Sequence, residues 1–151
     1  MIPSKRSMLI NIARHVIRDV QPTRLLNKKH FGDFKSYKKI HIIAIGKAAS
    51  GMAAAAKKIL GTKTGRIFLA NEGHPLPTAN SVRNTREIIK FAKSTTGKDF
   101  VIVLISGGGS AMMEMPALGL TLSDLTKTTS LLLKCGATIN EMNIVRKHLS
   151  E

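Results

Sequence analysis

Apolar residues follow two patterns that alternate along the chain, one with the spacing of a helix and one with the continuous character of a buried strand. The first pattern occupies residues 6–20, ends at Pro22 and places six apolar side chains on one helix face: Leu9, Ile12, Ala13, Val16, Ile17 and Val20. Nearly continuous apolar runs of strand length follow at residues 40–45, 66–70 and 100–105. We therefore expect a helix followed by three strands.

Helical segments are predicted between and after these strands. An alanine-rich helix over 46–60 has small side chains suited to close packing on a sheet. After a loop at 71–80, the next helix is expected to be capped by Asn80 or Ser81, with its apolar side formed by Val82, Ile88, Ile89 and Ala92. A helix over 123–135 closed by Gly136, and a last segment from about residue 140, complete the pattern. Such alternation is typical of an α/β fold with a doubly wound, mostly parallel sheet, which binds ligands at the carboxyl ends of its strands.

Composition places these elements in one aliphatic domain. The chain has 151 residues, 43% of them hydrophobic, with no tryptophan and a single tyrosine. Its one cysteine, Cys135, excludes an internal disulfide framework and is typical of a reducing compartment; its apolar helical surroundings predict a buried side chain. The N-terminus lacks a signal-peptide core, and no apolar run approaches the ~18 residues of a membrane span. We expect a cytoplasmic protein without a membrane partner.

Positive charge is concentrated in the first half of the chain. The formal net charge is +15, and residues 1–66 hold 15 basic and 2 acidic side chains. This imbalance is consistent with a solvated basic face, with an acidic counterpart elsewhere in a longer protein, or with steering of small anionic substrates. Nucleic-acid binding is the least favoured interpretation, because the basic cluster has no interleaved aromatic residues and matches no recognition module.

A triple-glycine loop follows the third predicted strand and carries the clearest functional signal. It comprises Ser106, Gly107, Gly108, Gly109 and Ser110. Glycines leave successive backbone N–H groups free to face an anion, and serine hydroxyls add donors, so we predict a phosphate-binding loop. A dinucleotide fingerprint and a nucleophile elbow both require glycine where Met112 stands, and a Walker A loop requires Ser or Thr where Ala48 follows Lys47. The remaining alternative is a tight strand-to-helix turn.

Other candidate side chains are expected at the same sheet edge. Lys47 follows the first strand and is predicted in the first turn of the next helix, where anions are favoured; the alternative is an ordinary surface lysine. His74 follows the second strand and precedes Pro75, so it could donate to a phosphate or carboxylate, or only to its own loop. Asn143 and Arg146 lie in a polar final segment that also fits a solvated helix face.

Four strings resemble, in order and spacing, the glycerate 2-kinase family, some members of which are labelled hydroxypyruvate reductase. They are AIGKAASGMA (44–53), EGHPLPTANS (72–81), VIVLISGGGSAM (101–112) and INEMNIVRKHLS (139–150). The resemblance implies a Rossmann-like N-terminal domain, of which residues 1–151 form a part with an incomplete C-terminal end and without the family's second domain. It implies a transferase of carbohydrate metabolism that uses ATP and a divalent metal such as Mg²⁺ to phosphorylate D-glycerate to 2-phosphoglycerate. The chain alone is expected to be inactive.

The resemblance also assigns roles. It implies that Lys47 is catalytic and contacts the substrate and the transferring phosphoryl group, that residues 106–110 bind nucleotide, and that the remaining substrate-binding residues are His74, Asn143 and Arg146. It assigns no metal ligand, and elimination leaves three candidates for a general base: Glu72, Glu114 and Asp124. The chain departs from the family where Pro77 is followed by Thr78 and Ala79 instead of the common Asp-Glu.

Two other classes of function remain open from the residues. A phosphosugar-binding module of the sugar-isomerase type would use a similar helix start and serine-rich loop without ATP. A basic nucleic-acid-binding domain would show a steep salt dependence of binding. A homo-oligomer is compatible with all three interpretations.

Overall fold

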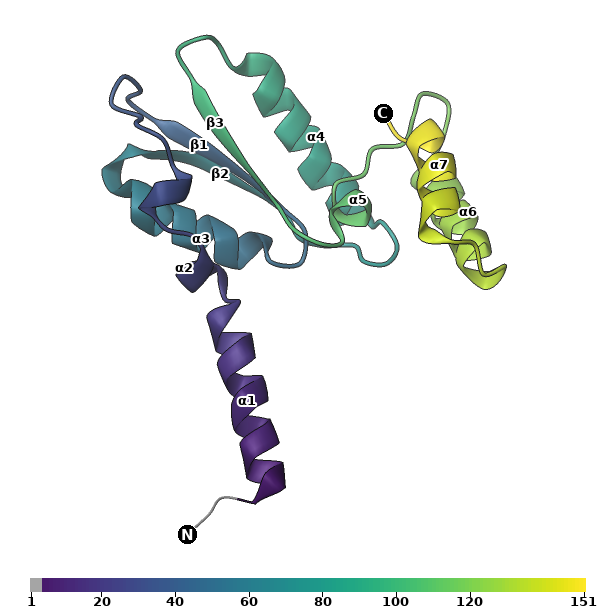
Figure 1. Cartoon of the computed structure of the whole chain (residues 1–151). Helices are drawn as coiled ribbons and strands as arrows, with labels where there is room; N and C mark the ends of the chain where they lie inside the picture. Colours follow the sequence, from purple (N-terminus) through teal and green to yellow (C-terminus); the bar gives the residue numbers. More distant parts are fainter. Residues whose placement is uncertain (1–3) are drawn as a thin grey trace.

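Three parallel strands form the centre of the computed structural model, which describes residues 4–151 (Figure 1). They are β1 (Ile40–Ile45), β2 (Thr64–Ala70) and β3 (Phe100–Ile105), hydrogen-bonded in the order β2-β1-β3. The sequence predicts the bounds of β1 and β3 correctly, whereas β2 begins at Thr64 and not at Arg66. Because the strands are parallel, all three carboxyl ends lie at one edge of the sheet.

Helices cover both faces of this sheet. Alternate side chains of β1 point to opposite faces, so one set packs on α3 (Ala49–Leu60) and the other on α4 (Ala79–Ser94). The α3 cluster consists of Ile42, Ala44, Ala49, Ala53 and Ala56, and the α4 cluster of Ile43, Ile45, Ala70, Ile88 and Phe91. The doubly wound α/β architecture is therefore confirmed, with three parallel strands and a small-residue contact on the α3 side.

The start and the buried face of α4 differ from the sequence expectation. Thr78 is the N-cap: its hydroxyl accepts from the N–H of Ser81, and the Ser81 hydroxyl accepts from the N–H of Thr78. The earlier start is possible because threonine is itself a good N-cap residue. The buried face of α4 is formed by Ser81, Thr85, Ile88 and Phe91. Ala92, which was expected on this face, is exposed.

The N-terminal segment contains helices that add little to the core. α1 (Lys5–Asp19) contains no buried residue and extends away from the sheet in Figure 1, so its apolar stripe is exposed. Pro22 follows the end of this helix and is also the first residue of α2 (Pro22–Leu25), a position where proline is well tolerated. A 3₁₀ turn, η1 (Lys28–His30), precedes β1, and a second one, η2 (Gly61–Lys63), joins α3 to β2. None of the helices described is long and apolar enough to cross a membrane.

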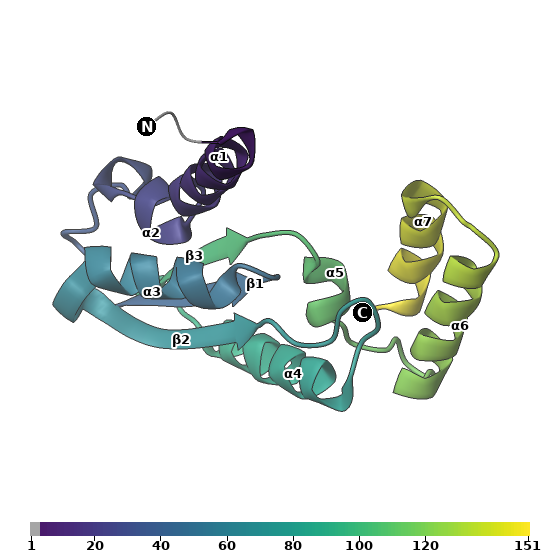
Figure 2. The ribbon, with the colours of Figure 1, turned by 90° about the horizontal axis from the view of Figure 1, so that it is seen from below.

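The C-terminal part is a helical hairpin beside the sheet edge. α5 (Gly109–Met112) leads to α6 (Leu122–Lys134) and α7 (Ile139–Leu149), and Figures 1 and 2 show α6 and α7 side by side, with α5 between them and the strands. Each long helix begins with a capping box, Thr121 with Asp124 and Thr138 with Glu141. Hydrogen bonds from the threonine hydroxyl and N–H lower the pKa of each carboxyl group.

Cys135 is exposed, and the expectation of a buried thiol is wrong. The residue follows the last turn of α6, and its thiol donates to the carbonyl of Leu132 at 3.3 Å. The flanking Leu131 and Leu133 are exposed as well. Apolar neighbours in sequence therefore did not mean a buried environment, because α6 turns only one side toward α7 and the end of the helix is open.

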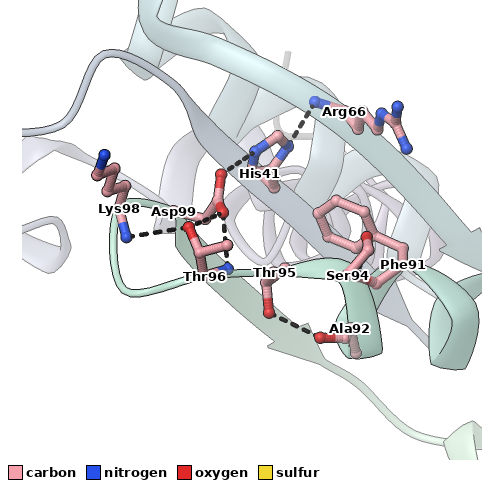
Figure 3. A network of polar contacts seen from close by, with 9 residues as sticks. All are labelled: His41, Arg66, Phe91, Ala92, Ser94, Thr95, Thr96, Lys98 and Asp99. Carbon is pink, nitrogen blue, oxygen red and sulfur yellow. Dashed lines mark hydrogen bonds and ion pairs between the residues drawn. The ribbon is translucent and has the colours of Figure 1, made fainter.

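A polar network closes the opposite, amino end of the sheet (Figure 3). The register of β1 against β2 shifts between Ile40 and Ile42, and the Nδ1 atom of His41 accepts from the N–H of Arg66 at 3.0 Å. The Nε2 atom of His41 faces Asp99 at 3.6 Å. Hydrogen bonds from the N–H and hydroxyl of Thr96 lower the pKa of Asp99. The imidazole thus replaces a backbone acceptor at the bulge and has a structural role.

Candidate functional site

The loops that follow β1 and β3 are joined by hydrogen bonds at the carboxyl edge. Both the N–H and the hydroxyl of Ser106 donate to the carbonyl of Ile45, at 2.9 and 3.0 Å. In return the N–H of Ala48 donates to the Ser106 hydroxyl oxygen at 3.0 Å, and the N–H of Lys47 donates to the carbonyl of Gly107 at 2.9 Å. The triple-glycine loop is therefore held in a defined position against the start of α3.

Gly46 makes this close approach possible. Its φ is +102°, and a Cβ at this position would overlap the carbonyl and hydroxyl oxygens of Ser106. This steric requirement is not predicted by the place of Gly46 beside Lys47 in the sequence. The available signal was a glycine placed directly after a buried strand, at the edge where a parallel sheet binds its ligand.

Lys47, His74 and Gly108 converge from three separate loops. A Cβ on Gly108 would lie 2.9 Å from Cδ2 of His74 and 3.4 Å from Cγ and Cε of Lys47. Gly108 itself has φ +85°, a conformation that favours glycine. Lys47 lies two residues before the first residue of α3 and not in its first turn, because α3 begins at Ala49. The Lys47 side chain is exposed and has no ion pair within residues 4–151.

The backbone of the loop offers donors to an anion. No hydrogen-bond acceptor among residues 4–151 takes the N–H groups of residues 107–110. The hydroxyl of Ser106, in contrast, already donates to Ile45 and accepts from Ala48, so this residue fixes the loop. Free N–H groups beside a primary ammonium form a donor set suited to phosphate. A cluster of three or more His, Cys, Asp or Glu side chains that could hold a metal is absent from the residues described.

Arg146 and Asn143 reach the other side of the same loop from α7. The Nη2 atom of Arg146 donates to the carbonyl of Ser110 at 2.5 Å and to Oε2 of Glu114 at 2.9 Å, and Nη1 donates to the Ser110 hydroxyl at 3.2 Å. Asn143, Arg146 and Ser110 line a cavity of about 300 Å³, together with Lys147. The structure thus brings the predicted site residues to the glycine loop, Lys47 and His74 beside Gly108 and Asn143 and Arg146 beside Ser110.

The three candidate bases are all engaged in hydrogen bonds. Glu72 accepts from Nδ2 of Asn80 at 2.7 Å in the loop before α4, and Asp124 caps α6. Glu114 is 4% exposed and paired with Arg146. Each of these carboxylates accepts its hydrogen bonds at a single oxygen, and only Glu114 is also buried and ion-paired. The capping partner of Asp124 is a local signal in the sequence, whereas the partner of Glu114 lies 32 positions away and is found only in the fold.

Comparison with protein families and curated proteins places the chain among known relatives. The model of a family described as a domain of unknown function, DUF4147, matches residues 8–151. A glycerate 2-kinase of Pyrococcus horikoshii is 41% identical over 132 residues, which are 79% of this chain and 30% of that protein. A D-glycerate 2-kinase of Thermotoga maritima is 34% identical over an alignment of 164 residues, which covers 98% of this chain and 39% of that protein. The chain therefore spans about a third of the length of these relatives.

Solved structures agree with this assignment. The crystal structure of a glycerate kinase from Thermotoga maritima is similar with a TM-score of 0.74 at 34% identity, over 95% of this chain and 38% of that chain. A crystal structure of a protein from Pyrococcus horikoshii has the same TM-score, 0.74, over 99% of this chain and 40% of that chain. The strands, the glycine loop and the C-terminal hairpin thus occur together in a fold that glycerate kinases use.

Proposed function

The chain belongs to the DUF4147 family, and from this premise we propose that its site serves the ATP-dependent phosphorylation of D-glycerate to 2-phosphoglycerate. The observation that carries the proposal is that Lys47 and His74 meet at Gly108, where no side chain stands between them, at the carboxyl edge of the sheet. The names of the relatives support the substrate and the reaction class. Because ATP is available in the cytoplasm and the single cysteine suits a reducing compartment, we propose a cytoplasmic location.

The nucleotide phosphates are proposed to lie on the glycine loop. The N–H groups of residues 107–110 are available to donate to phosphate oxygens, and the hydroxyl of Ser110 can add a further bond. Ser106 contributes by holding the loop in place. A divalent ion such as Mg²⁺, bound with the nucleotide, would neutralise phosphate charge. The donor set of this loop fits an anion, whose own oxygens would supply ligands for that ion.

Lys47 is proposed as the catalytic residue. In phosphoryl transfer negative charge spreads over the equatorial oxygens of the moving group, and a fixed ammonium stabilises it without forming a covalent bond. The exposed Lys47 side chain beside Gly108 is suited to this electrostatic role. Its backbone N–H bond to Gly107 keeps the residue at a constant distance from the loop.

The substrate is proposed to contact the two sides of the loop. His74 can donate from the Lys47 side, and Asn143 and Arg146 form the wall of the cavity beyond Ser110. An amide and a guanidinium are suitable partners for a carboxylate or a hydroxyl group. The charge of Arg146 is balanced by Glu114, so Lys147 and Lys47 supply the net positive charge around glycerate.

Equilibrium binding separates this function from its alternatives. We expect ATP to bind the chain, a sugar phosphate without a nucleotide to bind more weakly, and a DNA duplex to show no steep, multi-charge salt dependence. A coupled assay of the full gene product with D-glycerate and ATP should show turnover. Preferred binding of the sugar phosphate, or a steep salt slope with DNA, would favour the corresponding alternative.

Replacing Lys47 with alanine tests the catalytic assignment directly. In the full gene product, turnover should fall about 100-fold or more, the scale for losing one preorganised electrostatic contact, while ATP affinity changes much less. Lys58→Ala, an exposed lysine on α3, is the matched control and should keep wild-type turnover. If Lys47→Ala retains near-wild-type turnover, Lys47 is an ordinary surface lysine.

A further inference from the structure

Glu114 is a buried carboxylate for which the proposed reaction has no use. It lies just after α5, and its side chain is 5% exposed. Its partner is Nη2 of Arg146 at 2.9 Å, and the Arg146 side chain is 11% exposed. Both charges are therefore largely withdrawn from water and depend on each other, because a charge in such a place without its partner is unfavourable.

The same guanidinium connects this ion pair to the glycine loop. Arg146 donates to both the carbonyl and the hydroxyl of Ser110, the last residue of the loop. Its Nε atom is buried without a partner among the described residues, so the contacts of this side chain with Ser110 and Glu114 are made by its Nη atoms. Glu114 neutralises the guanidinium of Arg146, and that guanidinium binds Ser110. We call Glu114, Arg146 and Ser110 the clamp between α7 and the loop.

We propose that Glu114 is a positioning residue that orders the phosphate-binding end of the glycine loop through Arg146 and Ser110. The proposal rests on the proposed nucleotide role of this loop and deepens it. Without the Glu114 charge, the buried guanidinium would be drawn toward water and would release Ser110. The short helix α5, which begins at Gly109, would then lose its attachment to α7.

The experiment uses Glu114→Gln in the 151-residue chain, with Glu87→Gln as matched control on the exposed side of α4. Backbone amide exchange is read at Ala111, Met112 and Met113, whose N–H groups donate to the carbonyls of Gly108 and Gly109 around the turn of α5. ATP binding is measured on the same samples. We expect Glu114→Gln to exchange at least about 10-fold faster at these amides than wild type, with β1 amides unchanged, and to bind ATP about 10- to 100-fold more weakly.

Each outcome decides between a positioning role and a general stabilising role. Equal ATP affinity and equal exchange in Glu114→Gln and Glu87→Gln would overturn the proposal. If wild type itself binds no ATP, the proposed function fails, and the α5 exchange alone then decides whether Glu114 orders the loop.

A second variant keeps the test informative if the Glu114→Gln substitution prevents folding. Glu114→Met combined with Arg146→Met replaces the ion pair by apolar side chains, a change that often preserves stability. A folded double variant with fast α5 exchange and weakened ATP binding supports the clamp. A folded double variant with wild-type α5 exchange and ATP binding shows that the loop needs no clamp and refutes the proposal.

Discussion

Replacing Gly108 with alanine tests whether the glycine loop works because no side chain stands between His74 and Lys47. The backbone at this position has φ +85°, where a residue with a Cβ is disfavoured by about 1–2 kcal/mol. The new Cβ would also lie 2.9 Å from Cδ2 of His74, closer than ordinary contacts allow. Because the His74 ring is exposed, it can move aside, so we expect a total loss of about 1–3 kcal/mol in the free energy of unfolding.

Gly119→Ala provides a control with the same backbone strain and without the crowding. Gly119 has φ +86°, and a Cβ there would meet no atom within 4 Å. Thermal unfolding should therefore show a loss of about 1–2 kcal/mol for this variant, equivalent to about 2–4 °C per kcal/mol for a chain of this length. Any difference in the free energy of unfolding between the two variants measures the crowding of the new methyl group against His74 and Lys47.

ATP binding by calorimetry then separates stability from function. In Gly108→Ala the methyl group occupies the face proposed for phosphate and displaces His74, so we expect the Kd for ATP to rise about 10-fold or more, which corresponds to about 1.4 kcal/mol. Gly119→Ala should bind ATP as wild type does. If folded Gly108→Ala binds ATP with unchanged affinity, the triple glycine is only a tight turn, and the phosphate assignment of the loop is refuted.

Two further predictions concern the helices outside the sheet. Hydrogen bonds lower the pKa of Asp124 and Glu141 below their ordinary values of 3.8 and 4.5, so the stabilisation they give α6 and α7 should be complete above those values and lost as pH falls through the lowered ones. Circular dichroism during acid titration should show this loss in wild type, and an identical acid response in Asp124→Asn/Glu141→Gln would contradict it. Leu9 and Ile17 on α1 are 67% and 60% exposed, so the 151-residue chain is expected to self-associate. Sedimentation should show less association in Leu9→Gln/Ile17→Gln, and a strictly monomeric wild type would disprove the expectation.

Local patterns were enough to predict the sheet and the loops at its edge. The bounds of β1 and β3 follow from continuous apolar runs that end at glycine or at Ser106. The central strand β1 is buried on both faces, whereas the edge strand β3 leaves Val103 and Ile105 exposed, which its apolar run did not predict. The expectation that Lys47, His74 and the glycine loop share one edge follows from parallel strands alone. The short-range capping signals were less decisive, since Thr78, Asn80 and Ser81 are all good caps and only one could begin α4.

The contacts that give each site residue its role were decided by the tertiary structure. The Ser106 hydroxyl is bound to Ile45 and Ala48, 61 and 58 positions away, and Arg146 is bound to Ser110, 36 positions away. The exposed position of Cys135 and the buried pair of Glu114 and Arg146 likewise depend on how α6 and α7 pack. A sequence pattern reports which faces are apolar over a few turns, whereas the choice of a hydrogen-bond partner depends on distances between segments that only the folded chain brings together.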